Sequence, residues 1–92
     1  MIESFKHKGL KKLYTEGKVQ GVRQDQVGRI TMILDSLDAA ETIEELNLPA
    51  FRFHALQGYN PTRYSMKVSG NYRITFEWNN GQAQKIDLED YH

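Results

Sequence analysis

The spacing of apolar residues changes halfway along the chain. Before about residue 48 they recur every three or four positions, and after Pro49 they recur every second position. Spacing of three to four residues is typical of helices with one buried side, whereas alternation is typical of strands with one buried face. The sequence therefore predicts helices in the first half of the chain and a sheet in the second half.

Two helices are predicted in the first half. Residues 8–16 place their leucines and a tyrosine on one side and their lysines largely on the other. From about residue 23 to residue 39 the apolar positions again have helical spacing, at Val27, Ile30, Ile33, Leu34 and Leu37. Thr42 and Glu45 have the spacing of a capping box, which predicts a short helical turn over residues 43–46.

About four strands are predicted in the second half, and residues 2–5 indicate a short opening strand. The alternating apolar residues are Phe51 and Phe53, then Tyr64, Met66 and Val68, then Tyr72, Ile74, Phe76 and Trp78, and finally Ile86 and Leu88. Residues 69–71 and 79–81 have the composition of hairpin turns. The last strand is expected over residues 82–88.

The order of these elements predicts the fold class. It indicates one α+β domain over residues 1–92, with two N-terminal helices packed on one face of a small, mainly antiparallel sheet. The apolar strand residues would then face the helices. The polar residues between them would lie on the opposite face, at Arg52, His54, Lys67, Arg73 and Thr75.

Composition narrows the classes of function. The chain has 92 residues, of which 39% are hydrophobic and 26% are charged, as is typical of a soluble globular protein. It has no cysteine, which excludes disulfides and thiolate chemistry and fits a cytoplasmic location. No apolar stretch suits a signal peptide or a membrane span, so we expect neither.

The net charge is zero, but it is unevenly distributed. Residues 1–29 carry a net charge of +4, residues 30–50 of −5 and residues 51–92 of +1. A protein that holds nucleic acid by bulk charge alone is basic. A nucleic-acid role therefore needs a local basic patch or a larger partner.

Several polar residues of the second half suit RNA cleavage without a metal. The 2′-hydroxyl attacks the adjacent phosphorus, which requires a base, an acid for the leaving 5′-oxygen and a cation for the phosphoryl oxygens. Histidine titrates near neutrality, and arginine donates paired hydrogen bonds to phosphate. The candidates are His54, Arg73, Asp90, Tyr91 and His92.

Each candidate also has a purely structural interpretation. His92 can be a solvated terminal residue, His54 a hydrogen-bonded sheet residue and Arg73 a cross-strand partner of a carboxylate. The lysines of residues 8–12 are more often a solvated helix face than an RNA groove. The histidines lack HxH and HExxH spacing, so no metal site is expected.

Four stretches of the chain are similar to one known family. MIESFKHKGLKKLY, FRFHALQG, YSMKVSGNYRITFEWNNGQA and LEDYH together resemble the HigB-type toxins of the RelE superfamily, in the same order from Met1 to His92. The resemblance implies a RelE-like fold and a ribosome-dependent endoribonuclease that cuts mRNA in the decoding site without a cofactor. It also implies a HigA-like antitoxin with a helix-turn-helix domain, through which the complex binds operator DNA.

The resemblance also assigns active-site positions. The histidine of the family's H-x-L-K-G segment falls on His54, the arginine of its N-[WY]-R-I-T-F segment on Arg73, and its closing D-Y-H on Asp90, Tyr91 and His92. We expect Arg73 to bind the scissile phosphate and either histidine to act as acid or base. Asp90 is expected to orient an imidazole, and Tyr91 to hold the nucleotide.

One position departs from the family pattern. The lysine before the glycine of H-x-L-K-G belongs to the family's catalytic set, and here the residue is Gln57. Glutamine donates a hydrogen bond but carries no charge, and charge-assisted hydrogen bonds are about twice as strong as neutral ones. Either Arg73, Lys67 or Lys85 supplies the missing charge, or the activity is lower.

Two alternative functions fit the same superfamily. ParE-like relatives poison DNA gyrase, and they are not expected to need the closing DYH residues. A chain weakened by Gln57 would act only as a module that binds an antitoxin.

Overall fold

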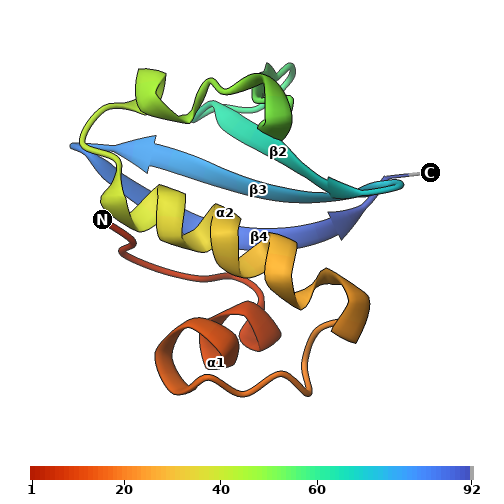
Figure 1. Ribbon diagram of the computed structural model, residues 1–92. Helices are drawn as coiled ribbons and strands as arrows, with labels where there is room; N and C mark the ends of the chain where they lie inside the picture. The colour runs from red at the N-terminus through yellow and green to blue at the C-terminus, as the bar shows by residue number, and fades with distance from the viewer. Residues whose placement is uncertain (92) are drawn as a thin grey trace.

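The computed structural model describes residues 1–91 and contains two α-helices followed by a four-stranded sheet (Figure 1). The elements are α1 (Lys8–Glu16), α2 (Val27–Ala39), β1 (His54–Leu56), β2 (Arg63–Ser69), β3 (Tyr72–Asn79) and β4 (Gln82–Asp90). The strands lie in chain order, and each pairs antiparallel with the next. The predicted α+β class is confirmed. Within residues 1–91, no helix combines the length and the apolar character needed to span a membrane.

The helix α1 has the bounds that its sequence predicts. His7 precedes it, and His7 Nδ1 accepts a hydrogen bond from the Leu10 N–H at 3.1 Å, which satisfies one of the free donors of the first turn. Gly17 ends the helix in the left-handed conformation with φ of 70°, where glycine meets no steric penalty. Leu10 is fully buried and attaches α1 to the core.

The helix α2 supplies most of the helical core. A 3₁₀ turn at Gln24–Gln26 leads into it, so the helical segment begins near residue 23 as predicted. Its buried residues are Ile30, Ile33, Leu34 and Leu37. Thr42 and Glu45 form the predicted capping box of a 3₁₀ turn at Ile43–Leu46, in which Glu45 accepts the Thr42 N–H at 2.7 Å.

Two of the predicted strands differ in the structure. Phe51 lies in a 3₁₀ turn that starts at Pro49, and Arg52 then adopts a left-handed conformation with φ of 47°. Proline is pre-organised for the first position of a helical turn, so the alternation at Phe51 and Phe53 led to a wrong prediction there. The predicted opening strand is also wrong as a regular strand, because it forms only isolated parallel bridges from Ile2 and Phe5 to β4.

The strand β4 runs two residues beyond the predicted end at residue 88 and contains an irregularity. Its register with β3 shifts by one residue between Thr75 and Glu77, and Lys85 has φ of 50°. Such a bulge inserts an extra residue and re-aims the side chains that follow. Ala83 and Ile86 are therefore both buried in the core, although they are three positions apart.

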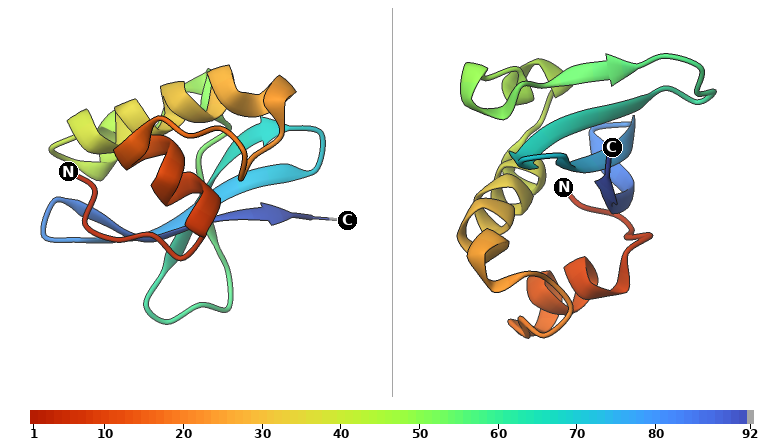
Figure 2. Two further views of the ribbon diagram at one scale, coloured as in Figure 1. Left: turned by 90° about the horizontal axis from the view of Figure 1, so that it is seen from below. Right: turned by 90° about the vertical axis from the view of Figure 1, so that its right-hand side faces the viewer.

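The sheet has one covered face and one open face. The helix α2 crosses one face, and α1 lies next to α2 beside β4 (Figure 2). Phe76, Ile74 and Met66 are fully buried in the core formed with these helices. The other side of the sheet carries no helix within residues 1–91, and we call it the open face.

Candidate active site

The strand register lines up polar residues on the open face. Lys67 of β2, Arg73 of β3 and Glu89 of β4 are direct neighbours in one row. The next row contains His54, Ser65, Thr75 and Asp87, one from each strand. Directly paired residues of an antiparallel sheet point to the same face. The sheet therefore brings His54, Lys67 and Arg73 to one surface.

Arg73 has a donor that no other described residue uses. Its Nη1 is buried and has no hydrogen-bond partner within residues 1–91. A buried charged donor without a partner is destabilising, and an incoming anion removes this cost by forming a charge-assisted hydrogen bond. The guanidinium carbon lies 6.0 Å from the centre of the Tyr91 ring. Arg73 is thus prepared to bind an anion beside an aromatic ring.

Tyr91 is held in place beyond the end of β4. Its backbone N–H donates to the Asn71 carbonyl at 2.8 Å, in the turn between β2 and β3. Burial raises the pKa of Tyr91 above its usual value of 10.0, and the charges of Glu89 and Tyr59 raise it further, while Arg63 and Arg73 act in the opposite direction. The hydroxyl therefore stays protonated at neutral pH and can donate a hydrogen bond. His92, the next predicted site residue, lies outside the described residues.

His54 is exposed at the edge strand, and both of its ring nitrogens have neighbours. Nδ1 lies 3.0 Å from the Arg52 carbonyl oxygen, and Nε2 lies 3.3 Å from Ser65 Oγ. A carbonyl only accepts, so the contact assigns the proton to Nδ1 and leaves Nε2 of a neutral ring as the acceptor. That nitrogen can take a proton from a substrate hydroxyl in place of Ser65.

Asp90 is not brought to the same surface as Arg73. It is the register partner of Tyr72, which belongs to the covered face, whereas Glu89 is the partner of Arg73. Since successive residues of a strand alternate between faces, Glu89 is the carboxylate that approaches Arg73. Within residues 1–91, no three His, Asp or Glu side chains gather closely enough to hold a metal ion.

The three predicted substrate-binding residues occupy different places. Gln57 is exposed in the turn that follows β1. Lys67 is half-buried in the row of Arg73. Lys85 Nζ lies 3.9 Å from Glu77 Oε1, and the Lys85 side chain is 63% exposed. Of the two lysines, Lys67 is therefore the direct neighbour of Arg73, whereas Lys85 pairs with a carboxylate.

A second arginine of the open face was missed by the sequence analysis. Arg63 is only 8% exposed, and it donates to Thr75 Oγ1 and to the Lys85 carbonyl, each at 3.0 Å. It also forms an ion pair with Glu77 at 3.3 Å, and the Thr75 hydroxyl in turn donates to Glu89. Residue 63 alternates in step with Ser65 and Lys67, so the sequence places it on the open face. No sequence signal reveals this hydrogen-bond network.

Of the residues predicted for the open face, Arg52 lies outside the sheet, and Thr75 lies on that face but is buried. Arg52 lies in the left-handed turn before β1 and contributes its carbonyl to His54. Thr75 is fully buried, and its hydroxyl accepts a hydrogen bond from Arg63 and donates one to Glu89. Tyr59 was also missed by the sequence analysis; it lies in the loop between β1 and β2, is 48% exposed, and is close enough to Tyr91 to raise its pKa.

Comparison with known proteins identifies the family of the chain. Residues 3–92 match the family of the RelE-like toxin of type II toxin-antitoxin system HigB. The chain is 45% identical to Endoribonuclease HigB of Proteus vulgaris over 92 residues, which cover both chains completely. It is also 29% identical to Toxin HigB-1 of Vibrio cholerae serotype O1 over 93 residues, which cover 99% of this chain and 98% of the other.

Proposed function

Because the chain belongs to the HigB-like family of RelE-like toxins of type II toxin–antitoxin systems, we propose that it is an endoribonuclease that cuts mRNA on the translating ribosome. A relative of 45% identity is named Endoribonuclease HigB, which supports the chemistry. The observation that carries the proposal is Arg73 Nη1, a buried donor without a partner in residues 1–91, beside Tyr91 on the open face. A phosphate group of RNA is the anion that fits this place.

Arg73 stabilises the charge that develops during cleavage. When the 2′-hydroxyl attacks the adjacent phosphorus, negative charge accumulates on the non-bridging oxygens, and a pre-positioned donor lowers the barrier. Loss of one such donor typically costs about 10²–10³-fold in rate. Lys67, its half-buried neighbour, adds positive charge that Gln57 does not bring.

The proton transfers use groups around Arg73. The base takes the proton of the 2′-hydroxyl, a 2′,3′-cyclic phosphate forms, and the acid gives a proton to the departing 5′-oxygen. Nε2 of His54, which lies beside Ser65 Oγ, and the imidazole of His92 are the two candidates for these steps. Tyr91 holds the nucleotide through its ring and its protonated hydroxyl. The register places Asp90 on the covered face of β4. Its proposed role is to orient an imidazole across the edge of this strand.

The partners follow from the family and from the charge. As a type II toxin the chain has an antitoxin, and we propose a helix-turn-helix protein through which the complex binds operator DNA. A single cytoplasmic domain with no net charge captures free RNA poorly, so the ribosome presents the mRNA to it.

The test is cleavage of a defined mRNA in a purified translation system, with and without ribosomes. We expect ribosome-dependent cuts by the natural chain, a loss of about 10²–10³-fold in Arg73→Ala, and a loss of about 10²–10⁴-fold in His92→Ala. The matched control is Arg52→Asn, because Asn tolerates the left-handed backbone of residue 52 and the side chain lies off the sheet.

Two outcomes would contradict the proposal. Arg73→Ala that is folded and cleaves as fast as Arg52→Asn would remove Arg73 from the site. A folded natural chain that cuts no mRNA on ribosomes would instead favour gyrase inhibition or a module that only binds an antitoxin.

A further inference from the structure

The carboxylate of Glu89 lies beside Arg73 but bonds to a different residue. Glu89 is the register partner of Arg73, so the two side chains extend from neighbouring positions of the open face. Within residues 1–91, no ion pair joins them. Glu89 instead accepts a hydrogen bond from the Thr75 hydroxyl. The acidic neighbour of Arg73 is therefore already bonded, while Arg73 Nη1 stays buried without a partner in the described part of the chain.

Arg63 determines the direction of the Thr75 hydroxyl. Arg63 Nη2 donates to Thr75 Oγ1 at 3.0 Å, so it occupies the acceptor side of that oxygen. A hydroxyl has a single proton to donate, and with Arg63 on its acceptor side the proton is directed to Glu89. Thr75 is fully buried, so its hydroxyl has no access to bulk water. The bond from Thr75 to Glu89 thus depends on Arg63.

Arg63 is itself fixed by two further contacts. Its Nη2 also donates to the Lys85 carbonyl at 3.0 Å, at the bulge of β4, and its Nη1 pairs with Glu77 at 3.3 Å. The Arg63 and Glu77 side chains are only 10% and 13% exposed, so salt screens this ion pair less than a surface pair. One end of the network is therefore a buried ion pair, and the other end is the carboxylate of Glu89.

We propose that Arg63 and Thr75 are positioning residues that keep the Glu89 carboxylate from neutralising Arg73. This inference rests on the function proposed above, in which Arg73 binds the scissile phosphate. A carboxylate released beside a partly buried guanidinium forms an ion pair with it, because both groups gain a charge-assisted hydrogen bond. The phosphate would then have to displace that carboxylate. By holding Glu89, the two residues keep the Arg73 donor available to the substrate.

A purely structural role of this network makes a different prediction. If Arg63 and Thr75 only stabilise the sheet, loss of the Thr75 hydroxyl lowers the stability of the protein, and no change at Glu89 restores the activity. If they hold Glu89, the loss of activity depends on the negative charge of Glu89. Removal of that charge then restores the activity.

The test is a double-mutant cycle on Thr75 and Glu89. Thr75→Val removes the hydroxyl at nearly constant volume, and Thr75→Ala is a second variant that lacks the same hydroxyl. Thr75→Ser is the matched control, because it keeps the hydroxyl and removes a buried methyl group. Glu89→Gln removes the charge. Thermal unfolding checks that each variant is folded, and single-turnover cleavage of mRNA on ribosomes is measured at increasing toxin concentrations.

We expect Thr75→Val to weaken productive binding about tenfold, the effect of one charge-assisted hydrogen bond to phosphate. The double variant Thr75→Val with Glu89→Gln should recover most of this loss. Thr75→Ser should cleave nearly as fast as the natural chain, although it lacks a buried methyl group. A defect caused by lower stability would instead affect serine at least as much as valine.

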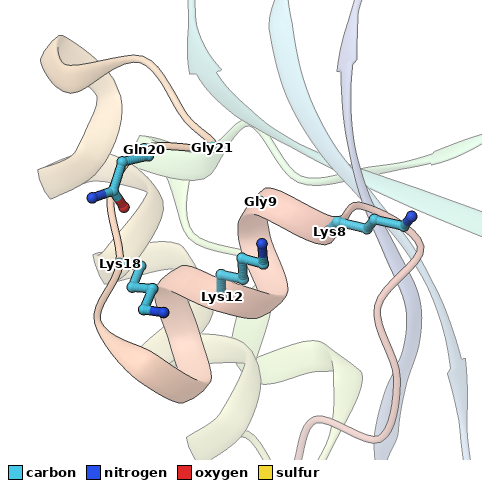
Figure 3. A pocket seen from close by; sticks show the side chains of 6 residues that line it. All are labelled: Lys8, Gly9, Lys12, Lys18, Gln20 and Gly21. Atoms are coloured by element: carbon cyan, nitrogen blue, oxygen red, sulfur yellow. The ribbon is translucent and has the colours of Figure 1, made fainter.

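A second readout does not require cleavage. Inorganic phosphate is titrated into the toxin, and binding is followed by the NMR signal of the Arg73 side chain. The signal has to come from Arg73, because three lysines line a separate hollow of the surface and also attract anions (Figure 3). We expect Thr75→Val to weaken phosphate binding at Arg73 about tenfold, and Glu89→Gln to restore it.

Phosphate binding at Arg73 that is equal in the natural chain and in folded Thr75→Val and Thr75→Ala would overturn the inference. A defect of Thr75→Val that Glu89→Gln does not relieve would also overturn it, since the hydroxyl would then be purely structural. If the natural chain cuts no mRNA but Thr75→Val weakens phosphate binding at Arg73 and Glu89→Gln restores it, the proposed cleavage fails and the positioning of Glu89 stands.

Discussion

At the scale of single residues, the two arginines of the open face have different roles. Arg63 is buried, and its donors already bond to Thr75, Glu77 and the Lys85 carbonyl. Arg73 keeps one buried donor without a partner in residues 1–91. An arginine whose donors are engaged stabilises the sheet, whereas an arginine with a desolvated free donor favours an anion. The sequence shows both as polar strand residues, and only the bonding separates them.

The substitution Gln57→Lys tests whether this chain has a weakened site. A lysine there adds a charge-assisted hydrogen bond to phosphate in place of a neutral one, which is worth about 1.4 kcal/mol or a tenfold increase in rate. We expect single-turnover cleavage on ribosomes to accelerate by about that factor. The control is Gln24→Lys, which adds the same charge at an exposed position in the 3₁₀ turn before α2.

A substitution of Lys67, the neighbour of Arg73 in the sheet, makes this experiment more decisive. If Lys67 supplies the charge that Gln57 lacks, Lys67→Gln should slow the natural chain more than it slows the Gln57→Lys variant. A natural chain that is fully active and gains nothing from Gln57→Lys would show that the site tolerates glutamine.

At the scale of the elements, the start of the chain is fastened to the end of α2. Asp38 is an acid in the last turn of a helix, where the helix dipole disfavours it. It accepts the Ile2 N–H at 3.1 Å and a hydrogen bond from the Tyr14 hydroxyl, and these bonds lower its pKa below 3.8. Burial and Asp38 raise the pKa of Tyr14 to about 12. Three separate elements therefore meet at one carboxylate.

This junction predicts a specific pH dependence of stability. The carboxylate of Asp38 has a lowered folded pKa, so its contribution is present above its usual pKa near 3.8 and is lost as the pH falls below that value. Neutral Tyr14 contributes below pH 10, and this contribution is lost as the pH rises toward 12. We expect Asp38→Asn to cost about 1 kcal/mol at pH 7 after solvent screening.

Urea unfolding at pH 3, 7 and 11 checks this prediction. The difference between the natural chain and Asp38→Asn should be largest at pH 7 and smaller at both extremes. Glu44→Gln, which changes an exposed acid away from this junction, should show no such maximum. A difference that stays constant across this pH range would mean that the junction contributes nothing through ionisation.

The elements also show what a sequence can predict. The bounds of α1 and the capping box at Thr42 followed from local patterns, because local bonds determine them. The bulge at Lys85 and the left-handed Arg52 did not, because these conformations depend on how a strand or turn fits the rest of the sheet. For the same reason the sequence did not reveal that Glu89 is the register partner of Arg73, whereas Asp90 pairs with Tyr72.

At the scale of the whole molecule, the zero net charge limits the electrostatic attraction between the protein and free RNA. The basic charge is concentrated in residues 1–29 and the acidic charge in residues 30–50, so long-range attraction to free RNA largely cancels. The open face nevertheless carries the residues that we propose for phosphate binding and proton transfer. On the proposed ribosome-dependent function, the ribosome would then supply the capture of the RNA rather than the chemistry.

Reversing two acidic charges tests whether the ribosome supplies only the capture of the RNA. Glu41 and Glu44 are exposed, and their replacement by lysine raises the net charge from zero to +4 without touching the open face. If the ribosome provides only capture, the double variant Glu41→Lys with Glu44→Lys should cleave free RNA slowly, at a rate that falls steeply with added salt. The variant with glutamine at both positions, with a net charge of +2, should be intermediate. Tight binding of free RNA by the lysine variant without any cleavage would show that the ribosome also orients the reacting groups, because capture alone would then be insufficient for the reaction.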